Sequence, residues 1–232
     1  MLCIRTMQTR DPSRDQAKPT PPIPHDIIEN FMIRSLVFAG IVCLACLSLS
    51  VHGEELSREE QDAGFKPMFN GQDFTGWRFT DGKEATDVPN WKVADGIIRL
   101  SGGGAPHLCT SREYGDFEMR FEWRSTQDNY NSGFFIRSGK GLGTNQLNLA
   151  KGGEGAFIGG KIDGAKAVPG LQKPAREWNE WQVVAQGDKV TFTCNGKPAW
   201  VGTGLKSTTG YIGLHAEGAG MEFRKLRIRE IQ

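Results

Sequence analysis

The chain has 232 residues, with 28 lysine and arginine residues against 27 aspartate and glutamate residues. This near balance provides no electrostatic attraction to nucleic acid or to an anionic membrane surface, so neither is an expected partner. The 30 glycines favour a fold with many turns over one built from long helices.

The N-terminal part of the sequence reads as a targeting region. Residues 1–31 are polar and proline-rich without a hydrophobic period, and are interpreted as a leader or a mis-called start. Residues 32–53 have the pattern of a secretory signal peptide, with Arg34 before the apolar residues 36–49. This run is shorter than the ~20 residues that span a membrane, so cleavage is favoured over an anchor, with a lipoprotein at Cys46 as a minor alternative. We expect a periplasmic or secreted chain without a stable membrane span after cleavage.

A short helix or linker is expected at residues 54–64, because Ser57 and Glu60 have the spacing of a capping box. One domain, residues 65–232, is expected to follow. Short alternating runs dominate this domain, and hairpin turns are predicted at Asp95-Gly96, Gly187-Asp188 and Asn195-Gly196.

Residues 117–124 show the clearest alternation, with four apolar residues on one side and Glu118, Arg120, Glu122 and Arg124 on the other. The apolar residues are expected to face the core. The charged residues are either an ion-paired, solvated face or the floor of a site. Residues 133–137 are expected to form the neighbouring strand and to bring Arg137 to the same face. From the parity of their positions, we expect Glu118, Glu122, Arg137, Gln146 and Asn148 to project from one sheet face into a shared groove.

Many short strands without crossover helices predict an all-β antiparallel sandwich. Two cysteines lie in the predicted domain, Cys109 and Cys194. They are interpreted as buried thiols in strands, with one disulfide as the alternative.

Six stretches of the sequence occur in an order that resembles a known family. They are FKPMFNGQDFTGWR, WKVADGIIRLSGGG, LCTSREYGDFEMRFEWR, NSGFFIR, REWNEWQVVAQGDKVTFTCNGKPAW and GYIGLHAEGAGMEFRKLRIREI. Their order and spacing resemble the 3-keto-disaccharide hydrolase domain from residue 65 to residue 231. The resemblance implies a concanavalin A-like jelly roll in an exported protein that acts on sugars oxidised at carbon 3.

The chain departs from that family at one strand. Members of the family often have glutamate and glutamine two residues apart on this strand. This sequence has Gln146 and Asn148 at those positions, with Ala150 where an acidic residue often follows. The stretch GLHAEG, which contains His215 and Glu217, also differs from the commoner family patterns. If the family chemistry needs a carboxylate at position 146, this chain lacks it.

An ordinary glycosidase needs two carboxyl groups at a defined separation. Glu118 and Glu122 lie four residues apart on one strand, which places their alpha carbons about 13 Å apart at ~3.3 Å per residue. That separation is unsuitable for a retaining enzyme and awkward for an inverting one. A 3-keto sugar needs less, because its ketone acidifies the hydrogen on carbon 2, so that one base and one oxyanion stabiliser suffice.

The candidate site residues follow from this chemistry. Arg137 is the expected oxyanion stabiliser, and His215 or Glu122 the expected base, with Glu217 in support. Gln146 and Asn148 suit recognition of sugar hydroxyls, because amides both donate and accept hydrogen bonds. The remaining candidates for substrate binding are Glu118, Lys161 and Asp163.

The expected partner is a carbohydrate substrate, and no cofactor is predicted. A divalent metal ion held by His107, His215 and Glu217 is an open alternative, although no histidine pair has zinc spacing. The alternative to an enzyme is a non-catalytic carbohydrate-binding module of the same fold. A conventional glucanase is a third alternative, but the sequence lacks a strand with closely spaced catalytic acids.

Overall fold

The computed structural model describes residues 56–83, 90–218 and 220–232. These residues belong to one compact unit, His52–Gln232. The predicted leader and signal peptide lie outside the described residues. No helix among the described residues is long and apolar enough to cross a membrane.

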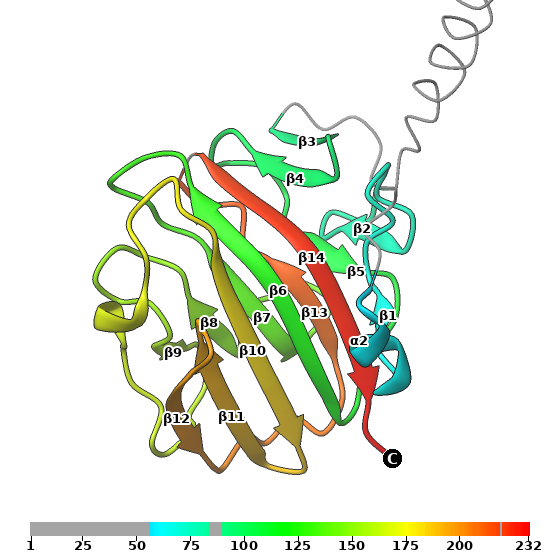
Figure 1. The fold of residues 1–232 in the computed structure, drawn as a ribbon, viewed down its shortest axis with the longest axis vertical. Coiled ribbons are helices and arrows are strands. Elements are labelled where there is room, and N and C mark those ends of the chain that lie inside the picture. Colours follow the sequence, from blue (N-terminus) through cyan, green and yellow to red (C-terminus); the bar gives the residue numbers. More distant parts are fainter. Residues whose placement is uncertain (1–55, 84–89, 219) are drawn as a thin grey trace, which may run out of the picture. The chain divides into compact units, whose positions relative to one another are not determined.

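Two antiparallel sheets face each other, as the sequence predicted (Figure 1). The eight-stranded sheet has the order β12 (Lys197–Gly202), β11 (Lys189–Cys194), β10 (Asn179–Gln186), β6 (Phe117–Ser125), β14 (Met221–Glu230), β4 (Ile97–Leu100) and β3 (Trp91–Ala94), with β1 (Lys66–Pro67) paired to β14. The six-stranded sheet has the order β2 (Trp77–Phe79), β5 (Leu108–Thr110), β13 (Tyr211–Leu214), β7 (Gly133–Ser138), β8 (Gln146–Asn148) and β9 (Phe157–Ile158).

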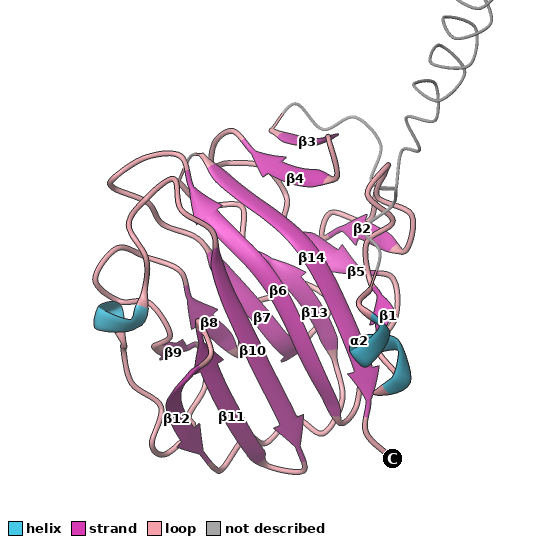
Figure 2. Ribbon diagram, in the orientation of Figure 1, coloured by secondary structure: helices cyan, strands magenta, loops and turns pink. Residues whose placement is uncertain are grey.

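Helix is nearly absent from the described residues (Figure 2). Helix α2, Arg58–Asp62, begins with the predicted capping box: Ser57 accepts from the Glu60 amide, and Glu60 accepts from the Ser57 amide. Within the described ranges there is also one 3-10 turn, η1, at Pro169–Leu171.

The predicted hairpin turns are confirmed. Asp95 and Gly96 join β3 to β4, and both have positive φ angles, 55° and 72°. Asn195 and Gly196 join β11 to β12 with φ angles of 51° and 72°. Asparagine, aspartate and glycine tolerate this left-handed conformation, which matches the twist of the flanking strands.

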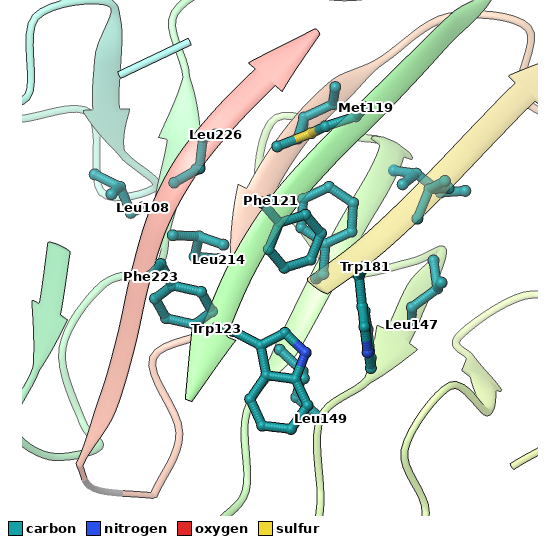
Figure 3. Close-up of a cluster of buried hydrophobic side chains, with 14 of the residues drawn as sticks. Leu108, Met119, Phe121, Trp123, Leu147, Leu149, Trp181, Leu214, Phe223 and Leu226 are labelled. Carbon is teal, nitrogen blue, oxygen red and sulfur yellow. The ribbon is translucent and has the colours of Figure 1, made fainter. Parts of the chain in front are cut away.

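The core lies between the sheets. Phe117, Met119, Phe121 and Trp123 of β6 are each at most 1% exposed. Figure 3 shows Phe121 and Trp123 beside Trp181, with Leu147, Leu149 and Leu214 of the six-stranded side close by. Each such side chain contributes about 1.5–3 kcal/mol by its burial, so the inward side of β6 anchors the sandwich.

The expected pairing of residues 117–124 with residues 133–137 is wrong. Strand β6 pairs with β10 and β14, whereas β7 pairs with β13 and β8 in the other sheet. The two strands follow each other in the chain but lie in opposite layers, because residues 126–132 carry the chain from one sheet to the other. Alternation shows which side chains share a face, but it does not show which sheet a strand joins.

Candidate functional site on the six-stranded sheet

The outward face of the six-stranded sheet gathers polar and aromatic side chains in two cross-strand rows. In the first row, Phe135 of β7 lies opposite Gln146 of β8 on one side and Gly213 of β13 on the other. Gly213 in turn lies opposite Cys109 of β5. Phe135 and Cys109 belong to a small apolar cluster separate from the main core, which places this row on the outside of the sandwich.

The second row contains the two histidines. His215 follows β13 directly, and its backbone amide donates to the Gly133 carbonyl. His107 precedes β5, and its ring lies edge-to-face against the His215 ring with centroids 4.5 Å apart. Gly133 lies opposite Asn148 of β8, so Asn148, Gly133, His215 and His107 follow one another across four strands.

The loop at residues 139–145 covers one end of this face. Leu142 in that loop is 1% exposed, and a Cβ atom on Gly213 would lie 2.2 Å from its Cδ1 atom. The glycine therefore allows the loop to seal Cys109 and Phe135 from water. The histidine row lies beyond this cover and is only partly buried.

His215 is placed to accept a proton. Its side chain is 19% exposed, and its Nδ1 atom lies 3.3 Å from Oε2 of Glu217. The alignment falls short of a hydrogen bond, so Nδ1 is buried without a hydrogen-bond partner. Burial lowers the pKa of His215 below its ordinary value of 6.5, so the imidazole is neutral at pH 7.

A backbone amide positions the His107 ring. Its Nδ1 atom accepts a hydrogen bond of 3.2 Å from the Ala216 backbone amide. Burial, reinforced by His215, lowers the pKa of His107 to about 4, although Glu217 opposes the shift. His107 is therefore also neutral at pH 7. The sequence predicted His107 only as a possible ligand of a metal ion, because no local pattern indicates that residue 107 contacts residue 215.

Gln146 and Asn148 lie on the same face, as their spacing predicted. The Gln146 side chain lies flat over β7, because a Cβ atom on Gly133 would lie only 2.2 Å from its Nε2 atom. Its Nε2 atom donates to the Ser132 carbonyl at 3.4 Å, which leaves its Oε1 atom without a bond to the described residues. Asn148 donates to the Gly153 carbonyl at 3.2 Å, so its Oδ1 atom is likewise unoccupied by the described residues.

The predicted common groove for Glu118, Glu122, Arg137, Gln146 and Asn148 does not exist. The first two project from the eight-stranded sheet, the last two from the outward face of the six-stranded sheet, and Arg137 lies at one end between the layers. The five residues were grouped because β6 and β7 were expected to pair, and that pairing is absent.

Arg137 is a structural residue in this fold. Its side chain is 0% exposed and forms an ion pair of 2.6 Å with Asp116. Its other hydrogen bonds go to four backbone carbonyls, those of Gly115, Ala185, Gly187 and Ser207. Every N–H group of the guanidinium is engaged, so none is available to a substrate oxyanion.

The backbone explains this orientation. Arg137 has a φ angle of 41°, and the register between β7 and β13 shifts at this point. The irregularity turns the side chain away from the outward face and towards the β10–β11 turn. Strand parity would have placed it outside.

Glu118 and Glu122 belong to an ion-paired face, the first of the two alternatives for this strand. Glu118 is 3% exposed and accepts hydrogen bonds from Arg120, Gln182 and Arg229. Burial would raise its pKa, but the hydrogen bonds from Arg229 and Arg120 outweigh it and lower the pKa. A carboxylate held in this way is a poor proton acceptor.

Glu122 is held in the same manner by Arg224 and Lys225, at 2.6 Å and 2.9 Å. Burial would raise the pKa of Glu122, but the contacts with Lys225 and Arg224 outweigh it and lower the pKa. The predicted role of Glu122 as the base is therefore not supported by its position.

Lys161 and Asp163 form an exposed ion pair of 3.3 Å in the loop after β9. Asp163 pairs through its backbone with Thr203, at the β12 end of the other sheet. No contact joins either side chain to the histidine row among the described residues.

No group of three or more histidine, cysteine, aspartate or glutamate residues could hold a metal ion within the part of the chain that is described. Cys109 and Cys194 are both free and buried, as favoured over a disulfide. Burial raises the pKa of each thiol to about 11, so neither is a nucleophile at neutral pH.

Comparison with known protein families identifies the family of this chain. A model of the 3-keto-alpha-glucoside-1,2-lyase-like domain matches residues 64–229. The chain belongs to this family. Membership supports a carbohydrate-active function for the domain, in agreement with the resemblance seen in the sequence. None of the curated proteins compared with the chain matches it significantly.

Solved structures with the same fold include other carbohydrate-related proteins. A candidate glycosyl hydrolase from Parabacteroides distasonis aligns with a TM-score of 0.61 and 22% identity, over 77% of this chain and 99% of that one. The β-glucanase of Bacillus licheniformis aligns with a TM-score of 0.51 and 16% identity, over 72% and 97%. At these identities the likeness establishes the fold, a concanavalin-like sandwich, and nothing finer.

Proposed function

We propose that the chain is an exported enzyme that cleaves 3-keto-glycosides, such as 3-keto-disaccharides, with His215 as the base. The observation that carries this proposal is the outward face of the six-stranded sheet. It combines a neutral histidine, a carboxylate beside that histidine, and two amide side chains with unoccupied carbonyl oxygens.

The proposed reaction begins with removal of the hydrogen on carbon 2. Nε2 of His215 takes the proton, the electrons of the C–H bond form a double bond between carbons 2 and 3, and the ketone oxygen becomes an oxyanion. The electrons then return from that oxygen, a double bond forms between carbons 1 and 2 as the bond from carbon 1 to the aglycone oxygen breaks, and the imidazolium of His215 gives its proton to that oxygen. Addition of water to the resulting double bond completes hydrolysis.

The neighbouring side chains have distinct proposed tasks. Glu217 orients His215 and stabilises the imidazolium formed when it takes the proton. The unoccupied carbonyls of Gln146 and Asn148 accept hydrogen bonds from sugar hydroxyls. This arrangement requires no acid at position 146, so the departure from the commoner family pattern does not by itself remove the base.

The alternative is a carbohydrate-binding module of the same fold that performs no chemistry. The amide at position 146 favours this alternative if the family chemistry needs a carboxylate there. The neutral His215 beside Glu217 favours the enzyme, because sugar binding alone does not need a partly buried imidazole whose Nε2 atom has no hydrogen-bond partner among the described residues.

Export is proposed from the sequence of residues 32–53 alone, with the periplasm or the medium as the destination. Expression of the full chain in a bacterial host, followed by N-terminal sequencing of the periplasmic product, tests this proposal. A product that retains residues 32–53 would contradict cleavage.

The decisive experiment compares oxidised and unoxidised sugars. The purified chain is incubated with 3-keto-trehalose or 3-keto-cellobiose and, in parallel, with trehalose or cellobiose. We expect cleavage of the keto sugars only, and in heavy water we expect deuterium at carbon 2 of the product. Equal turnover of both sugar types would contradict the elimination mechanism, and binding without turnover of either would favour the binding module.

A further inference from the structure

The two histidines of the site differ in how their nitrogens are used. We infer that His107 and His215 hold opposite tautomers, and that the Nε2–H group of His107 donates a hydrogen bond to the ketone oxygen as it becomes an oxyanion. The inference rests on the proposed function. It assigns to His107 the role of oxyanion stabiliser, for which Arg137 has no N–H group available.

The tautomer of His107 follows from its backbone contact. Its Nδ1 atom accepts the Ala216 amide at 3.2 Å. A neutral imidazole carries one N–H group and one lone pair, so a ring that accepts at Nδ1 carries its proton on Nε2. Protonation of Nδ1 would set two donors against each other, which holds His107 in the neutral, donating form.

The tautomer of His215 follows from Glu217. Among the described residues, the polar side-chain atom recorded beside its Nδ1 is Oε2 of Glu217, at 3.3 Å, and a carboxylate can only accept. Glu217 is 47% exposed, so a small rotation of its side chain aligns the two groups. Nδ1 of His215 then carries the proton, and Nε2 presents a lone pair.

Both Nε2 atoms are accessible to a ligand. Of the two rings, only Nδ1 of His215 is both buried and without a hydrogen-bond partner. Neither Nε2 atom bonds to the described residues, so each retains contact with solvent. The rings lie edge-to-face with centroids 4.5 Å apart, so the proton acceptor and the hydrogen-bond donor belong to adjoining rings on one patch of the sheet.

This pairing matches the electron flow of the proposed reaction. The base removes a proton from carbon 2, and the negative charge appears on the oxygen of the adjacent carbon 3. A neutral donor suits that oxygen, because a cation in its place would repel the imidazolium that forms on His215. A fixed donor in a partly dry site costs no reorganisation when the charge develops.

The tautomers are tested without any substrate. Full-length chain labelled with 15N at histidine is examined by long-range 1H–15N correlation NMR at pH 7, and His107→Gln and His215→Gln variants assign the signals. We expect the protonated nitrogen to be Nε2 in His107 and Nδ1 in His215. The same tautomer in both rings would overturn the inference, whatever the chain does to sugars.

The donor role is tested with two variants of His107. His107→Gln retains an N–H donor near the position of Nε2, whereas His107→Phe retains the ring shape without a donor. With 3-keto-trehalose, we expect His107→Phe to lose about 10²–10³ in kcat with little change in KM, the scale for one lost oxyanion donor. His107→Gln is expected to retain distinctly more activity.

Three other kinetic results would contradict either the donor role of His107 or the proposed function. Equal kcat values for the two variants, whether both normal or both low, would overturn the donor role. A rise in KM without a fall in kcat would also overturn it, because that pattern indicates ordinary substrate binding. Absence of turnover by the unaltered chain would defeat the proposed function instead, so the two failures are distinguishable.

Discussion

Nη2 of Arg137 lies 2.6 Å from Oδ1 of Asp116, and this ion pair ties the six-stranded sheet to the eight-stranded sheet at one end of the sandwich. Arg137 belongs to β7, and Asp116 directly precedes β6. A cation that the sequence placed in a sugar site therefore holds the two layers together.

Replacement of Arg137 by alanine is expected to destabilise the fold. The change removes the hydrogen-bond donor of four backbone carbonyls, while Asp116, which is 34% exposed, keeps the Gly187 amide. A buried acceptor left unsatisfied costs about 1–3 kcal/mol, so the four together predict a loss of about 3 kcal/mol or more. Urea unfolding monitored by tryptophan fluorescence measures the loss. Arg176→Ala is the matched control, because its ion pair with Asp128 is exposed and is worth less than about 1 kcal/mol. Equal, small losses for both variants would contradict the structural role.

Replacement of His215 by glutamine is expected to remove the base. Proton transfer by a positioned side chain contributes about 10²–10⁴ to the rate, so kcat on a 3-keto-disaccharide should fall by that range. Glu217→Gln should give a smaller loss, since Glu217 acts through His215. Circular dichroism shows whether each variant is folded. A folded His215→Gln protein with full activity would exclude His215 as the base.

The Gly133→Ala variant is expected to weaken sugar binding through Gln146. The new methyl group would lie 2.2 Å from Gln146 Nε2 and displace the amide. One lost hydrogen bond of about 0.5–1.5 kcal/mol corresponds to a rise in KM of roughly 2–13-fold. Gln146→Ala should give a similar rise, whereas Gly139→Ala, in a position with nothing within 4 Å, should give none. Unchanged KM in both site variants would show that Gln146 does not contact the sugar.

The pH dependence of activity is expected to follow His215. The base acts in its neutral form, so kcat/KM should be constant near pH 7 and fall as the pH drops through the pKa of His215. Burial lowers that pKa below 6.5, so the midpoint should lie on the acid side of pH 6.5. A pH profile measured with a 3-keto-disaccharide tests this. A midpoint above pH 6.5 would indicate a different base.

Stability should also depend on pH through His107. Its pKa is about 4 in the folded chain, mainly because of burial, against an ordinary value of 6.5. Below pH 6.5 the unfolded chain binds a proton that the folded chain does not, so the free energy of unfolding should decrease from pH 6.5 towards pH 4. The decrease should be smaller in His107→Gln, which has no titrating ring at this position. Parallel pH profiles of unfolding for the two proteins would contradict the assignment.

Local patterns in the sequence predicted the elements of the fold. The alternation in residues 117–124 identified the buried side of β6, and the Asp-Gly and Asn-Gly pairs identified two turns with positive φ angles. Ser57 and Glu60 identified the start of α2. These features depend on residues a few positions apart, and their conformational preferences act over the same short range.

Which residues meet at the candidate site could be determined only from the tertiary structure. Gln146 and Asn148 were identified in the sequence by their amide groups, and because they lie two apart on one strand they share a face in any sheet. The contact between His107 and His215 depends on the pairing of β5 with β13, which no local pattern encodes. The direction of Arg137 depends on a register shift between β7 and β13.

The sequence by itself therefore determined the fold class, the family, the inward side of β6 and four of the side chains on the candidate face, those of Gln146, Asn148, His215 and Glu217. Only the tertiary structure decided which sheet each strand joins, that Glu118 and Glu122 are ion-paired on the opposite layer, and that His107 lies beside His215. The physical reason is that side-chain alternation is a property of one strand. The partners of a strand in this sandwich come from distant parts of the chain, and they are selected by the packing of the two sheets as a whole.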